Sequence, residues 1–392
     1  MKLAMIGFGQ AGGKIVDKFL EYDQRTNSGI VRSAVAVNTA KADLLGLEQI
    51  PEEHRVLIGQ ARVKGHGVGA DNELGAEIAE EDIDEIQGAI DNIPVHEIDA
   101  FLVVSGLGGG TGSGGSPVIS KHLKRIYTEP VYGLGVLPGG DEGGIYTLNA
   151  ARSFQTFVRE VDNLLVFDND SWRKTGESVQ GGYDHINEEI VRRFGVLFGA
   201  GEVGAGDNVA ESVVDSSEII NTLAGGGVST VGYASEDVEL SGSSGGLLSR
   251  FKGDEGGSDM DTANTTNRIT SLVRKAALGR LTLPCEIEGA ERALLVMAGP
   301  SQHLNRKGIE RGRKWLEEQT GSMEVRGGDY PTNEPRVAAA VLLSGIHNVP
   351  RIKELQQIAI EAQDNIDDIR QQSEDNLEQL VEDDEDELDP LF

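Results

Sequence analysis

The chain is 392 residues long, which is longer than an ordinary domain with a single hydrophobic core, so two domains are expected. Its formal net charge of −30 excludes a general nucleic-acid-binding protein, because neutralising phosphates requires clustered Lys and Arg. We expect a cytoplasmic protein without membrane insertion, because the sequence has no apolar run long enough to cross a bilayer, no signal peptide, and a single cysteine, Cys285, that cannot form an internal disulfide.

The first half of the chain alternates short apolar strands with amphipathic helices. Strands are expected near residues 2–6, 34–37, 99–104, 131–136 and 163–167. This alternation predicts an α/β fold with a doubly wound, mostly parallel sheet, and it places ligands at the carboxyl ends of the strands. A long helix over about residues 178–199 is expected to end this first domain, which spans residues 1–199.

The second half lacks the regular alternation of strands and helices and is expected to form an α+β domain over residues 200–350. Helices are expected near residues 208–225, 265–279 and 306–318, and strands near 228–235, 292–298, 322–326 and 337–343. Residues 241–262 are rich in Gly, Ser and Asp, which is typical of a mobile loop.

A last amphipathic helix is expected over residues 351–378, followed by an acidic, disordered tail over residues 379–392. Residues 361–392 hold fourteen acids and one arginine, and the rest of the chain is acidic as well. Such a charge suits a salt-rich cytoplasm, where high salt screens the self-repulsion of the protein.

Glycine-rich loops follow the first strand and the strand near residues 99–104. The first, Gly7-Phe8-Gly9-Gln10-Ala11-Gly12, fits the G-x-G-x-x-G pattern, and the second, GLGGGTGSG at residues 106–114, is a richer phosphate cradle. An NAD-dependent oxidoreductase would place an acidic residue at the end of the second strand, where this sequence has Asn38 and Thr39. Two phosphate loops instead favour a triphosphate that is held from two sides.

The sequence GGGTGSG at residues 108–114 resembles the signature of the tubulin and FtsZ superfamily, and other loops fall in that family's order. GFGQAGGK, VNTAKADL, GHGVGADNE and VLPGGDEGG look like its first, second, third and fifth nucleotide loops. The resemblance covers about residues 1–345 and is nearest to the CetZ group, the tubulin-like proteins of halophilic archaea. It implies a cytoskeletal GTPase that binds GTP, GDP and Mg²⁺ and polymerises head to tail into protofilaments.

The resemblance also implies a role for each loop. The residues expected along the phosphates are Gly9, Gln10, Ala11, Lys14, Gly108, Gly109, Gly110, Thr111 and Gly112. The residues expected beside the γ-phosphate and Mg²⁺ are Ala70, Asp71 and Asn72. The phosphates themselves are expected to hold the Mg²⁺ ion. The residues expected around the nucleoside are Glu142 at the ribose, Asn169 and Asn187 at the guanine edge, and Tyr183 stacked on the base. Asn38 and Pro138 are also expected to bind the nucleotide.

None of these loops clearly supplies a residue that positions the attacking water. In the family that the chain resembles, this group comes from the next subunit, and SVVDSSEII at residues 212–220 resembles the inserted loop and helix. Asp215 and Glu218 share one helix face and are expected to act on the neighbour's GTP, although both could simply complement the helix dipole. Val213 stands where FtsZ usually has Asn, which keeps open a GTP-binding filament or scaffold protein with little hydrolysis.

The CetZ resemblance implies a role in cell shape and motility rather than in division. The chain ends in DELDPLF, residues 386–392, where apolar side chains close an acidic run. Two interpretations stay open for this segment: a docking peptide for a protein partner, or plain solubilising charge.

Overall fold

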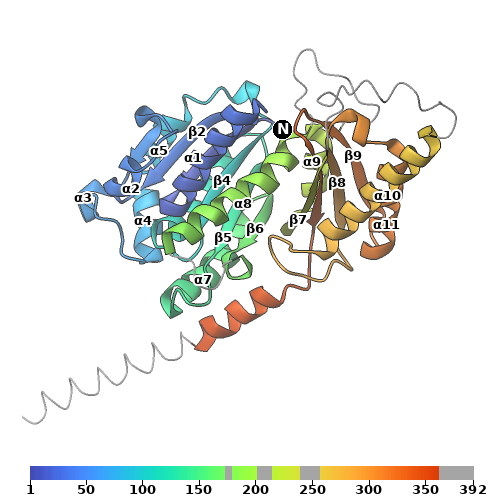
Figure 1. Cartoon of the computed structure of the whole chain (residues 1–392). Helices are drawn as coiled ribbons and strands as arrows, with labels where there is room; N and C mark the ends of the chain where they lie inside the picture. The colour runs from blue at the N-terminus through green and yellow to red at the C-terminus, as the bar shows by residue number, and fades with distance from the viewer. Residues whose placement is uncertain (173–178, 201–213, 239–256, 362–392) are drawn as a thin grey trace, which may run out of the picture.

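The computed structural model describes residues 1–172, 179–200, 214–238 and 257–361. Within these residues, ten strands form one sheet in the order β3-β2-β1-β4-β5-β6-β7-β10-β8-β9 (Figure 1). None of the described helices is both long and apolar enough to cross a membrane. The acidic tail and the segment DELDPLF lie outside the described residues.

The strands of the first half all pair in parallel, which confirms the predicted sheet. Their residues are mostly buried because helices cover both faces of the sheet, and this is why they form continuous apolar runs. The short strand β3 was not predicted. These strands are β1 (Leu3–Phe8), β2 (Val31–Asn38), β3 (Arg55–Leu57), β4 (Ala100–Gly106), β5 (Val131–Leu137) and β6 (Asn163–Asp168).

Alternate residues of each strand enter two separate hydrophobic cores. Ile6 of β1 packs in one core with the helices α4 to α7, whereas Met5 packs in the other with α1 and α8. The helices are α1 (Gly9–Thr26), α2 (Lys41–Leu45), α3 (Gln60–Val63), α4 (Asn72–Glu81), α5 (Ile83–Ile90), α6 (Thr111–Ile126), α7 (Gly144–Glu160) and α8 (Val179–Gly199).

The second half continues the same sheet. The strand β10 (Arg336–Ser344) runs antiparallel to both of its neighbours, β7 (Val228–Asp237) and β8 (Arg292–Gly299), and β9 (Glu324–Pro331) pairs with β8 in parallel. The halves meet where Leu164 and Leu165 of β6 pair with the start of β7. The helices are α9 (Ser216–Leu223), α10 (Gly257–Leu278) and α11 (Arg306–Thr320).

The structure corrects three boundaries of the second half. The strand β9 ends at Pro331 rather than near residue 326, and residues 214 and 215, which we expected in a helix, precede α9. Residues 257–262, which we expected in a mobile loop, are helical and open α10. Short 3-10 turns complete the fold: η1 (Glu52–His54), η2 (Val95–Glu97), η3 (Asn169–Ser171) and η5 (Ser301–His303). The last helix covers residues 350–361, so it starts one residue before the predicted range of 351–378, and the rest of that range lies outside the described residues.

Candidate functional site

A cavity of about 580 Å³ opens at the carboxyl ends of the parallel strands. The segments after β1, β2, β4, β5 and β6 all contribute to its lining, as do residues 66–70 and the first turns of α8. In an open α/β sheet this edge is where ligands bind, because the loops and helix N-termini that follow parallel strands gather there. The cavity therefore lies where the strand pattern predicts a ligand.

The structure brings the predicted nucleotide-binding residues together in this cavity, with two exceptions. Asp71 and Asn72 do not line it, since Asp71 caps α4 by accepting a hydrogen bond from the backbone N–H of Leu74 at 3.0 Å, and Asn72 is the first residue of that helix. The predicted residues in the lining are Gly9, Gln10, Ala11, Lys14, Asn38, Ala70, Gly108, Gly109, Gly110, Thr111, Gly112, Pro138, Glu142, Asn169, Tyr183 and Asn187.

Two helix N-termini and two glycine loops meet on one side of the cavity. The helix α1 starts at Gly9 and α6 starts at Thr111, so the positive ends of both dipoles face the lining. Gly9 has a φ of +74°, and a Cβ there would lie 2.8 Å from the backbone nitrogen of Gly112. A Cβ on Gly109, by contrast, would meet no protein atom within 4 Å. This combination of packed and open glycines suits a phosphate chain.

The third loop is tied to the fourth by a residue that the sequence did not reveal. Asn149 of α7 donates from Nδ2 to the carbonyl oxygens of Ala70, at 2.7 Å, and of Gly108, at 3.0 Å. Ala70 needs such support because its φ of +67° is left-handed, which a non-glycine residue adopts at a cost. Nothing in the sequence around Asn149 distinguishes it from other polar residues of an amphipathic helix.

Other residues of the lining carry polar side chains with nucleoside-binding chemistry. The side chain of Asn169 is buried, with 6% of the residue exposed, and its Oδ1 has no hydrogen-bond partner among the described residues. An unpaired buried acceptor is costly, so a donor on a bound ligand is expected to complete it. Tyr183 and Asn187 approach from one face of α8, four residues apart, and Glu142 accepts a hydrogen bond from the backbone N–H of Gly139 at 2.7 Å.

Asp215 and Glu218 lie at the opposite edge of the sheet. The helix α9 leads into β7, whose first residue, Val228, pairs with Leu164 near the start of β6 rather than its end. The helix α8 joins the two edges: its first turns line the cavity, and its 21 residues span about 30 Å. Figure 1 shows α9 near the N-terminus of the chain, at the far end of α8.

The two carboxylates of α9 differ in environment. Asp215 is the N-cap of the helix and accepts from the backbone N–H of Glu218 at 3.1 Å, while its hydrogen bond from Ser217 lowers the pKa of its carboxyl group. Burial raises the pKa of Glu218, and the negative charge of Asp215 adds to this effect. Val213, the position at which the sequence departs from FtsZ, lies outside the described residues.

Some lining residues were not predicted. Among them are His66, Tyr146 and Asp43, whose carboxylate accepts a hydrogen bond from Nδ2 of Asn38 at 3.1 Å. Asp43 and His66 could have been found because they sit inside the second and third loop motifs, VNTAKADL and GHGVGADNE, whereas Tyr146 lies on a helix without a distinguishing pattern.

Two family models match the chain in succession. The GTPase domain of the Tubulin/FtsZ family matches residues 2–177, and the C-terminal domain of the tubulin-like CetZ proteins matches residues 176–361. The chain belongs to the tubulin/FtsZ family, in its CetZ group. The predicted family, fold class and GTPase class are therefore confirmed.

Individual CetZ proteins show the same relationship. The chain is 83% identical over 374 residues to the tubulin-like protein CetZ1 of Haloferax volcanii, with 95% of each chain covered. The GDP-bound monomer of CetZ1 superimposes with a TM-score of 0.82 at 78% identity, over 93% of this chain and all of that one. The GTPγS-bound protofilament of CetZ2 from the same organism superimposes with a TM-score of 0.82 as well, at 45% identity, over 94% of this chain and all of that one.

Proposed function

We propose that this CetZ-group GTPase binds GTP in the 580 Å³ cavity, polymerises head to tail, and hydrolyses GTP at the junction between subunits. The observation that carries the proposal is the position of Asp215 and Glu218 at the edge of the sheet opposite the cavity. Because the cavity and α9 lie at opposite ends of α8, a helix about 30 Å long (Figure 1), these carboxylates would not reach the nucleotide of their own subunit. They can act on the nucleotide of a neighbour stacked along the same axis.

Such a contact is heterologous, because the cavity edge of one subunit meets the α9 edge of another. Repeating this contact produces an open filament rather than a closed ring, provided that the rotation between successive subunits does not close the assembly. The protofilament of the related CetZ2, which holds GTPγS, supports this arrangement. Loss of the γ-phosphate would then remove a ligand group from the junction and weaken it.

Within the cavity, we assign the phosphates to the backbone N–H groups of the first and fourth loops and to Lys14. Glu142 would accept hydrogen bonds from the ribose hydroxyls, Tyr183 would stack on the base, and Asn169 and Asn187 would pair with the guanine edge. The buried, unpaired Oδ1 of Asn169 fits this role, since guanine presents N–H donors there.

Mg²⁺ would be held mainly by the phosphates and by water. In the described parts of the chain, no group of three or more His, Cys, Asp or Glu side chains could hold a metal ion. Mg²⁺ retains several waters and is commonly bound through substrate phosphates, so the residues present fit such a site. When bound, the ion would neutralise negative charge on the phosphates.

In hydrolysis, Glu218 of one subunit would orient and polarise the water that attacks the γ-phosphate held by the next. A raised pKa makes this carboxylate a better proton acceptor than an ordinary glutamate, while Asp215 stays ionised beside it. The alternative, a GTP-binding filament with little hydrolysis, requires that these carboxylates only cap α9.

GTP turnover measured against protein concentration in molar KCl with Mg²⁺ tests this proposal. Wild type should show specific activity that rises above a threshold concentration, and Glu218→Ala should bind GTP but lose turnover. Glu85→Ala, an exposed glutamate of α5, serves as the matched control and should behave as wild type. Activity that is independent of concentration, or unaffected by Glu218→Ala, would contradict a site shared between subunits.

We further propose a cytoplasmic role in cell shape and motility rather than division, in line with the CetZ group. Replacing the chromosomal copy by the Glu218→Ala variant should alter cell shape and swimming while division continues.

The tail residues 386–392 are proposed to dock a protein partner. A pull-down that recovers the same proteins with and without these residues would refute that docking.

A further inference from the structure

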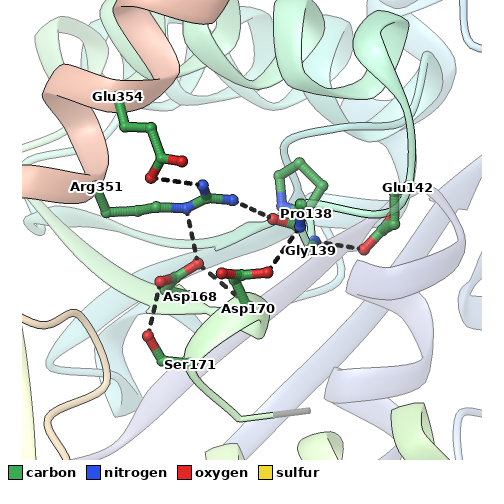
Figure 2. Close-up of polar contacts among 9 residues, drawn as sticks. Pro138, Gly139, Glu142, Asp168, Asp170, Ser171, Arg351 and Glu354 are labelled. Atoms are coloured by element: carbon green, nitrogen blue, oxygen red, sulfur yellow. Dashed lines mark hydrogen bonds and ion pairs between the residues drawn. The ribbon is translucent and has the colours of Figure 1, made fainter. Parts of the chain in front are cut away.

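Arg351 links the last helix to the nucleotide domain. It lies in the first turn of the helix at residues 350–361, and only 9% of its side chain is exposed. Its guanidinium group donates to Oδ1 of Asp168 at 3.3 Å, to the carbonyl oxygen of Pro138 at 3.0 Å, and to Oε2 of Glu354 at 3.0 Å (Figure 2). One side chain thus contacts the last helix and two other elements.

The two acceptors outside the helix belong to two different nucleotide loops. Pro138 opens the loop after β5 that carries Glu142, and Asp168 is the last residue of β6, directly before Asn169. The same loops are joined a second time, because the backbone N–H of Gly140 donates to Oδ1 of Asp170 at 2.8 Å. Figure 2 shows Arg351 between these loops, on the side away from Glu142.

We infer that Arg351 is a positioning residue for nucleotide recognition, which fixes the base-side Asn169 relative to the ribose-side Glu142. This inference rests on the proposed function, since it takes the cavity to be the nucleotide site. Arg351 itself does not line the cavity; it acts through Asp168 and Pro138, one and four residues from the recognition side chains.

The chemistry of the guanidinium group suits this task. Its planar fork holds two acceptors at a fixed spacing, whereas the ammonium group of lysine is a single point with no fixed plane. Asp168 is 2% exposed and also accepts from Oγ of Ser171 at 2.9 Å, so its carboxylate has a fixed orientation. A shift of either loop changes the distance between the two groups that would read the nucleoside.

Binding of GDP, IDP and 2′-deoxy-GDP to the full chain in molar KCl tests the inference. IDP lacks the exocyclic amine of guanine and 2′-deoxy-GDP lacks one ribose hydroxyl, so the two affinity ratios report on the base and the ribose separately. Arg351→Lys should keep the fold, because it keeps a charge beside Asp168, yet weaken GDP binding about tenfold and bring both ratios toward one. Arg351→Met should have a larger effect on the ratios and also lower the thermal stability.

Leu355→Ala is the matched control, since Leu355 is a buried apolar residue of the same helix and has no polar side-chain atom. It should lower the thermal stability while leaving both affinity ratios at their wild-type values. Wild-type ratios in Arg351→Lys and Arg351→Met, or an equal loss of discrimination in Leu355→Ala, would overturn the inference. Failure of wild type to bind GDP would instead refute the proposed function, so the two failures are distinguishable.

Discussion

Gly109 and Gly112 belong to one loop but are glycines for different physical reasons. A Cβ on Gly112 would lie 2.8 Å from the carbonyl oxygen of Phe8, so the close packing of the first and fourth loops excludes a side chain. A Cβ on Gly109 would meet no protein atom within 4 Å, and this residue lines the cavity. The fold requires one glycine, and the ligand is expected to require the other.

This contrast gives a matched pair of variants. Gly112→Ala should lower the free energy of unfolding by about 1–3 kcal/mol, because backbone atoms must move. Gly109→Ala should leave stability unchanged to within about 1 kcal/mol and weaken GDP binding at least about tenfold. Thermal unfolding and calorimetric GDP titration of both variants measure these effects. Wild-type GDP affinity in Gly109→Ala would exclude Gly109 from the phosphate cradle.

Glu218 provides a prediction on pH. Burial raises the pKa of its carboxyl group in the folded protein, so ionised Glu218 lowers stability above that pKa, and the penalty disappears as pH falls below the ordinary value of 4.5. Glu218→Gln should therefore be more thermally stable than wild type near neutral pH, with a difference that shrinks as the pH falls toward 4.5. Unfolding scans of unassembled protein between pH 4.5 and 8 measure this difference. A difference that is constant across this range would show that Glu218 has an ordinary pKa.

At the residue scale, the loops were predictable and their supports were not. Glycines between a strand and a helix indicate a phosphate loop because few other roles require such a backbone. Asn149 and Arg351 act by hydrogen bonds to carbonyl oxygens and a carboxylate far away in the sequence. No local pattern marks a residue of this kind, so only the folded structure reveals it.

At the element scale, α9 combines a structural role with a proposed catalytic one. Asp215 caps the helix through its side-chain oxygen, and an asparagine could accept the same hydrogen bond. Asp215→Ala should cost about 1 kcal/mol of stability, whereas Asp215→Asn should cost less than about 0.5 kcal/mol. Both should lower GTP turnover about a hundredfold if the carboxylate acts on water. Wild-type turnover in Asp215→Asn would assign this residue to capping alone.

The helices and strands themselves were largely predictable from periodicity. The strands β1, β4, β5 and β6 are apolar runs because both of their faces are buried, and α8 carries an apolar stripe because one face packs on the sheet. The strand β3 escaped prediction because its three residues are only half-buried. The start of α10 escaped because Gly, Ser and Asp are typical of loops.

At the scale of the whole molecule, the charge of −30 implies a dependence on salt. Repulsion among the acids opposes the compact state, and it is screened when the Debye length falls to about 3 Å near 1 M salt. The thermal unfolding temperature should therefore rise between 0.1 and 2 M KCl. An unfolding temperature that does not change over this range would show that the acidic surface is not a source of instability.

The central claim is that the GTPase site is shared between subunits. Mixing two variants that are each defective in one half of the junction tests it most directly, at a GTP concentration too low to fill the weakened cavity of Gly109→Ala. Glu218→Ala keeps an intact cavity, and Gly109→Ala keeps an intact α9, so a junction between them can be complete. In a random one-to-one copolymer about a quarter of the junctions pair an intact cavity with an intact α9, so turnover should recover to about a quarter of the wild-type rate. Sedimentation of the mixture confirms that both variants enter the filaments. Turnover equal to the average of the two separate variants, despite shared filaments, would contradict the account.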